Sequence, residues 1–129
     1  MDKQCIFAPH GAPAAGPYSH AVAAGPFLFV SGQGPMLKDG SGVLRGTIEE
    51  EARATLVNLR DVLEDCGSSM ERVVKVNVYL ADMNNFGRFN EVYKEFFTQE
   101  FPARTCIQAG RLPMDIQVEI EAIALSGDA

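Results

Sequence analysis

Apolar residues recur at helical spacing in two long stretches of the chain. Between Thr47 and Cys66 they return every three or four positions, which predicts one amphipathic helix. Thr47 and Glu50 have the spacing of a capping box, a signal for the start of a helix. From Asp82, a candidate N-cap, aromatic residues follow the same period in the segment before Pro102. The pattern therefore predicts two helices.

Other segments have the alternation or the apolar composition of β-strands. Gly25 and Pro26 mark a tight turn between two of them. The order of strands, helix, strand, helix and two strands predicts an α+β fold in which two helices pack on one face of a sheet. We expect residues 1–129 to form this single domain. The expected strands are Cys5–Phe7, His20–Ala24, Phe27–Val30, Glu71–Leu80, Ala103–Ala109 and Asp115–Leu125.

Alternate residues of a strand point to opposite faces of the sheet, so the sequence also predicts which side chains share a face. In the last strand Glu119 and Glu121 alternate with apolar residues, so we expect both glutamates to face away from the helices. The uncovered face is also expected to carry Arg104, Cys106, Gln108, Lys75, Asn77 and Tyr79. In the strand 71–80, Val74, Val76, Val78 and Leu80 are expected on one face and Val73 on the other.

The uncovered face is not simply polar, because Phe27–Val30 is apolar on both sides and Ile123 and Leu125 also point outward. Two helices cannot cover both faces of the sheet. We therefore expect a second copy of the chain to cover it, in a closed symmetric homo-oligomer.

Composition narrows the possible functions. The 129 residues have a net charge of -6, which argues against a nucleic-acid partner, and no stretch is apolar enough to span a membrane. The three cysteines form no CxxC pair and there are two histidines, so neither a disulfide framework nor a metal site is expected. The first residues lack the pattern of a signal or transit peptide, so the cytoplasm is the expected location.

Arg104 and Glu119 are the leading candidates for chemistry. They fit a plain ion pair at the rim of an interface, or a small-anion pocket in which the guanidinium binds a carboxylate with two hydrogen bonds. Asn90 lies near the apolar stripe of the second helix, where its amide needs either a loop backbone or a ligand as partner.

Cys106 and Ser31 give weaker signals. No histidine lies near Cys106 in the sequence and a strand offers no helix dipole, so a reactive thiol is not supported. Ser31 begins a Ser-Gly-Gln-Gly-Pro turn that fits an anion site but lacks the GK[ST] of a phosphate-binding loop.

Longer segments carry a family resemblance over nearly the whole chain. The most specific runs from Pro102–Cys106 through Arg111–Pro113 to Val118–Ala124. Supporting segments are Gly16–Ser19, Val30–Gln33 and Phe89–Tyr93. The chain resembles the Rid proteins, the reactive intermediate deaminases, and within them the RidA subgroup.

This resemblance implies a chorismate-mutase-like mixed sheet of about six strands in a homotrimer with clefts between subunits. It implies cofactor-free hydrolysis of 2-iminobutanoate and 2-iminopropanoate to 2-oxobutanoate or pyruvate plus ammonia. Arg104 would bind the substrate carboxylate, and Glu119 would hold the attacking water or move protons. Tyr18, Ser31 and Asn90 would shape the pocket, and Cys106 would contribute backbone groups.

Two other functions stay open. Some relatives are described as endoribonucleases that inhibit translation, although the acidity of this chain argues against that activity. A non-catalytic trimer that binds small carboxylates, or acts like a chaperone, would use the same pocket. The deaminase hypothesis requires Arg104 to lie at an interface between identical chains. A guanidinium turned into the helix-covered core would contradict this hypothesis.

Overall fold

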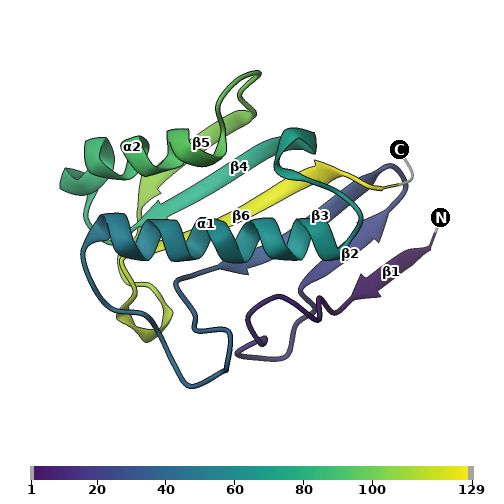
Figure 1. Cartoon of the computed structure of the whole chain (residues 1–129), viewed down its shortest axis with the longest axis horizontal. Coiled ribbons are helices and arrows are strands. Elements are labelled where there is room, and N and C mark those ends of the chain that lie inside the picture. The colour runs from purple at the N-terminus through teal and green to yellow at the C-terminus, as the bar shows by residue number, and fades with distance from the viewer. Residues whose placement is uncertain (1, 128–129) are drawn as a thin grey trace.

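A computed structural model describes residues 2–127 as one mixed sheet with two α-helices on one face (Figure 1). The strand order is β1-β2-β3-β6-β4-β5, and every neighbouring pair is antiparallel except β4 and β5. The expected α+β architecture is confirmed. The strands are β1 (Lys3–Ile6), β2 (Ala21–Ala24), β3 (Phe27–Gln33), β4 (Val73–Leu80), β5 (Ala103–Gln108) and β6 (Val118–Leu125), and the helices are α1 (Ile48–Asp65) and α2 (Phe86–Phe96).

Helix α1 starts as its sequence predicts. The Thr47 hydroxyl accepts a hydrogen bond from the Glu50 backbone at 3.1 Å, and the Glu50 carboxylate accepts one from the Thr47 backbone at 3.0 Å. Helix α2 begins later than expected, because Asp82 caps a short 3₁₀ turn, Met83–Asn85, that precedes it. One apolar face of each helix packs on the sheet and forms the core with it.

One strand departs from simple alternation. Val73 pairs with Ala124 and Lys75 with Ile123, which leaves Val74 as an extra residue in a bulge. Val73 is therefore buried and Val74 exposed, and the expected faces of these two residues are wrong. Downstream of the bulge Val76, Val78 and Leu80 are buried as predicted.

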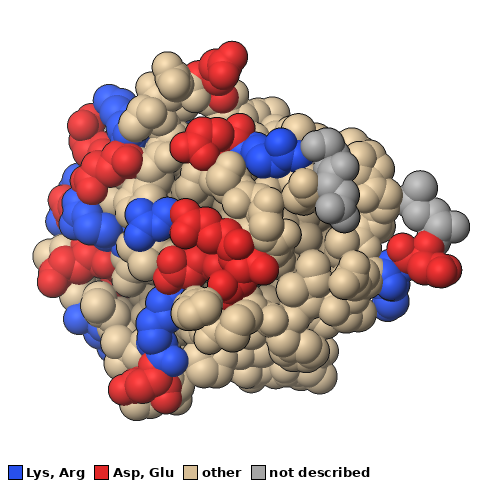
Figure 2. Space-filling view, turned by 45° about the vertical axis from the view of Figure 1, so that its right-hand side comes forward, with Lys and Arg blue, Asp and Glu red and all other residues tan. Residues whose placement is uncertain are grey.

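The opposite face of the sheet is left open by the helices. It exposes 41% of Phe27, 45% of Phe29 and 49% of Ile107. Most of the charged side chains in Figure 2 lie on one side of the view, beside a broad uncharged surface. None of the helices within residues 2–127 is long and apolar enough to cross a bilayer.

Candidate functional site

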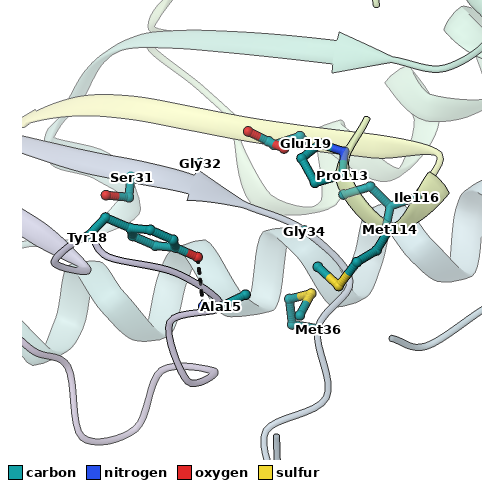
Figure 3. Close-up of a pocket in the computed structure, with 10 residues that line it drawn as sticks. All are labelled: Ala15, Tyr18, Ser31, Gly32, Gly34, Met36, Pro113, Met114, Ile116 and Glu119. Atoms are coloured by element: carbon teal, nitrogen blue, oxygen red, sulfur yellow. Dashed lines mark hydrogen bonds between the residues drawn. The ribbon is translucent and has the colours of Figure 1, made fainter. Parts of the chain in front are cut away.

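A cavity of about 500 Å³ opens at the end of β3 and the start of β6 (Figure 3). Three polar side chains line it: those of Tyr18, Ser31 and Glu119. Apolar residues from two loops, among them Met36 and Met114, complete its wall. The cavity brings together three of the residues that the sequence marks as candidates.

Among residues 2–127, Glu119 is the one charged residue in the lining of this cavity. Its carboxylate lies against Gly32 of β3, where a Cβ atom would overlap Oε2 and come within 3.0 Å of Cδ. Burial, and then the negative charge of Glu121, raise the pKa of Glu119 above its ordinary value. Within residues 2–127 no hydrogen-bond donor binds this carboxylate. Such a group is suited to accept and release a proton.

Ser31 and Tyr18 are held by the loop that precedes β2. The Ser31 hydroxyl donates to the carbonyl of Ser19 at 2.6 Å, and the Tyr18 hydroxyl accepts from the Ala15 backbone at 3.1 Å. Both hydrogen bonds are made within the chain, so the two side chains are positioned before any ligand binds.

His20 organises this loop, a role that the sequence did not indicate. The buried ring accepts from the Ala8 backbone N–H at Nδ1 and donates from Nε2 to the Ala12 carbonyl, at 3.0 and 2.8 Å. One acceptor and one donor nitrogen define a neutral imidazole. Within residues 2–127 no group of three or more His, Cys, Asp and Glu side chains is placed to hold a metal ion.

The two loops with methionines are also fixed by hydrogen bonds. Buried Asn58 donates from Nδ2 to the carbonyls of Gly34 and Met36, both at 2.9 Å. Arg45 donates to the carbonyls of Met114 and Asp115 at 2.7 and 3.4 Å. Met114 and Asp115 have φ values of 58° and 53°, a conformation that costs about 1–3 kcal/mol per non-glycine residue and concentrates at functional sites.

Arg104 lies in a second cavity, of about 440 Å³, between α2 and the segment that leads into β5. Its Nη1 donates to Asn90 Oδ1 at 2.8 Å, and its Cζ lies 4.7 Å from the centre of the Tyr93 ring and 5.5 Å from that of Phe86. Asn90 thus has Arg104 as its partner rather than a loop backbone. One hydrogen bond within residues 2–127 leaves most guanidinium donors available to an anion.

The expectation that Arg104, Cys106 and Gln108 share a face with Glu119 is wrong within one chain. In the parallel ladder Arg104 lies opposite Val76 and Cys106 opposite Val78, and both valines are buried beneath the helices. The three residues of β5 therefore face the helical layer, as the bond from the Met83 backbone to Gln108 Oε1 also shows. Among residues 2–127 no ion pair joins Arg104 to Glu119.

Arg104 nevertheless lies outside the core. Strand β5 forms an edge of the sheet, and the partly buried guanidinium lines an open cavity at that edge. Burial raises the pKa of the neighbouring Cys106 thiol and outweighs the opposite effect of Arg104, which argues against a thiolate nucleophile. One chain therefore holds a cationic pocket at Arg104 and an acidic pocket at Glu119, on different faces of its sheet.

Known proteins are similar to this chain in both sequence and structure. The family model described as Endoribonuclease L-PSP matches residues 9–126. A RutC family protein of Pyrococcus abyssi is 42% identical over 124 residues, 96% of this chain and 98% of the relative. A Mus musculus protein named 2-iminobutanoate/2-iminopropanoate deaminase is 44% identical over 117 residues, 90% of this chain and 87% of the relative.

Among solved structures, the crystal structure of yeast Mmf1 superposes with a TM-score of 0.92 at 38% sequence identity. The superposition covers 97% of this chain and 99% of the yeast chain. The similarity therefore covers nearly the whole chain.

Proposed function

Since this chain belongs to the Endoribonuclease L-PSP family, which includes the Rid proteins, we propose that it is a cofactor-free imine deaminase. Its substrates are short 2-imino acids such as 2-iminobutanoate and 2-iminopropanoate, which it hydrolyses to 2-oxo acids and ammonia. The name of the mouse relative supports this substrate class. Location in the cytoplasm stays a prediction.

The active site is proposed to form between two copies of the chain. Each copy supplies a cation beside Asn90 on one face and a carboxylate beside Gly32 on the other, and neither half-site is complete alone. The exposed aromatic side chains of Phe27 and Phe29 favour burial of the open face against another copy. The resemblance to Rid proteins favours a ring of three, in which each contact joins unlike surfaces.

The two groups have complementary tasks in the reaction. Arg104 holds the substrate carboxylate with two parallel hydrogen bonds and so fixes the adjacent C=N carbon. Glu119 accepts a proton from water as the water oxygen bonds to that carbon, and it passes this proton to the imine nitrogen. The hydroxyl proton of the resulting tetrahedral intermediate is then transferred through Glu119 to the same nitrogen. Collapse of the tetrahedral intermediate breaks the C–N bond, releases ammonia and leaves the 2-oxo acid. Proton transfer of this kind typically contributes about 100- to 10,000-fold in rate.

The observation that carries this proposal is the state of Glu119. Its carboxyl group lies in a cavity and has a raised pKa, and no donor within residues 2–127 stabilises its charge. A glutamate with a purely structural role would be expected to have such donors, as buried Glu51 has from the Gln117 and Gly46 backbones. Tyr18 and Ser31, at the same cavity, are proposed to orient the substrate, and the backbone at Cys106 to contact it.

Coupled turnover tests the proposal. Threonine dehydratase supplies 2-iminobutanoate, and semicarbazide captures whatever imine persists. We expect the wild-type protein to decrease capture strongly, and Arg104→Lys to lose this effect because an ammonium cannot replace the bidentate guanidinium. Glu119→Gln should bind the product 2-oxobutanoate but turn over at least about 100-fold more slowly.

Arg53→Lys provides a matched control, because Arg53 is exposed, pairs with Glu95 and lies outside both half-sites. Full activity in Glu119→Gln would remove this residue from the mechanism. Binding of 2-oxo acids with no imine turnover by the wild type would favour a non-catalytic carboxylate-binding protein.

The family description makes endoribonuclease activity the second candidate. The net charge of -6 opposes binding to a phosphate backbone. Cleavage of single-stranded RNA by purified protein, lost in Arg104→Ala, would support it, whereas cleavage that survives this substitution would indicate a contaminating nuclease.

A further inference from the structure

The cavity of Glu119 has two ends of different chemistry (Figure 3). Tyr18 and Ser31 lie at one end, and the thioether side chains of Met36 and Met114 converge at the other. At about 500 Å³ the cavity falls in the range of about 300–1,000 Å³ that accommodates drug-sized ligands. In a single chain, a four-carbon imino acid would leave much of this space unfilled.

The apolar end combines a fixed backbone with adaptable side chains. Asn58 anchors the backbone at Met36, and Arg45 anchors the strained backbone at Met114. Methionine side chains are unbranched and polarizable, so they fit apolar groups of various shapes. Met114 remains 43% exposed although its backbone is held, so its thioether is available to a ligand.

The proposed orientation of the substrate leaves one direction for its side chain. The imine carbon has three substituents: the carboxylate goes to Arg104 of the neighbouring copy, and the nitrogen lies near Glu119. The remaining substituent then meets the wall formed by Met36, Met114 and Ile116, which contains no charged group.

From this geometry, and on the basis of the proposed function, we infer that Met36 and Met114 form a side-chain subsite for apolar groups longer than ethyl. The protein then prefers imino acids with extended apolar side chains over the four-carbon substrate. It discriminates against acidic side chains, because among residues 2–127 no cation lines this cavity.

A chain-length series tests the inference. An amino-acid oxidase generates imines from 2-aminobutanoate, norvaline, norleucine and glutamate, and competition with semicarbazide gives kcat/KM for each. We expect kcat/KM to rise by about fourfold for each added methylene group. The glutamate imine should react more slowly than that of norvaline. Equal values along the apolar series would overturn the inference.

Substitutions assign the effect to the two methionines. Met114→Ala or Met36→Ala should lower the ratio of kcat/KM between the norleucine and the 2-aminobutanoate imines. Leu37→Ala is the matched control, because exposed Leu37 is adjacent to Met36 in sequence but does not line this cavity. An unchanged ratio in both methionine variants would contradict the assignment.

Product binding separates this inference from the proposed function. Calorimetry on the wild type should show tighter binding of 2-oxohexanoate than of 2-oxobutanoate, with a difference that Met114→Ala diminishes. That result without turnover of any imine would refute the deaminase and keep the subsite. Turnover with no dependence of binding on chain length would refute the subsite and keep the deaminase.

Discussion

At the scale of single residues, Glu119 is placed where its charge is poorly stabilised. The carboxylate is half-buried, has no donor within residues 2–127 and lies close enough to Glu121 for their charges to interact. Both effects favour the protonated form in the folded chain. A residue whose charge weakens the fold is typical of sites where reactivity takes precedence over stability.

Glu119→Gln should therefore stabilise the protein at neutral pH. A raised pKa in the folded state means that Glu119 favours folding below its ordinary pKa of 4.5, and that this contribution is lost as the pH rises through the folded value. We expect a gain in the free energy of unfolding of less than about 1 kcal/mol at pH 7, because the group is partly solvated. Urea unfolding should show no gain below pH 4.5, and an equal gain at every pH would contradict the linkage.

Glu121 provides a way to tune this group. Its negative charge is the second cause of the raised pKa of Glu119, so Glu121→Gln should move the acidic limb of the kcat/KM profile to lower pH. Tyr79→Phe serves as the control, because it removes the hydroxyl that donates to Glu121 but keeps the charge. A limb that stays in place in Glu121→Gln would show that another group controls it.

At the scale of elements, the end of β3 depends on a glycine. Gly32 faces Glu119 across the β3–β6 pairing, and a methyl group there would overlap the carboxylate. We expect Gly32→Ala to decrease kcat by 10-fold or more, as a misplaced catalytic group typically costs about 100-fold. Gly110→Ala is the control, since nothing lies within 4 Å of a Cβ at that exposed position. Wild-type kcat in Gly32→Ala would show that the position of Glu119 is not critical.

The elements also show what alternation can and cannot predict. In β6 the buried residues from Val118 to Ala124 contrast with the glutamates, and the predicted faces are correct. In β5 neither set of alternating residues is clearly apolar, so only the ladder with β4 decides that Arg104 faces the helices. Nothing in the sequence indicated the bulge at Val74, which lies in a run of three valines interrupted by Lys75.

At the scale of the whole molecule, the open face was predictable because two helices cannot cover two faces. The position of Arg104 on the other face from Glu119 was not, because it depends on which face an edge strand presents. His20 was missed for a similar reason: its two backbone partners lie in an irregular loop whose path has no periodic signal.

Assembly should depend on the exposed aromatic residues of this face. Phe29 is 45% exposed at the centre of the open side, opposite Ile123 of β6. Phe29→Glu would bury a charge in the contact, so we expect a monomer in sedimentation, with the circular dichroism of the fold retained and imine turnover lost. An active monomer would show that one chain suffices.

The arrangement of half-sites makes a prediction for mixed assemblies that no single-chain site can meet. Arg104→Ala and Glu119→Gln chains should each be inactive alone, because every site then lacks one group. When equal amounts are unfolded and refolded together, the two chains that meet at each interface are taken at random from the two variants. Half of the interfaces then have an intact Arg104 and half of those an intact Glu119, so roughly a quarter of the wild-type rate should return. Refolded single variants are the control, and a mixture as inactive as they are would contradict a site that is shared between two chains.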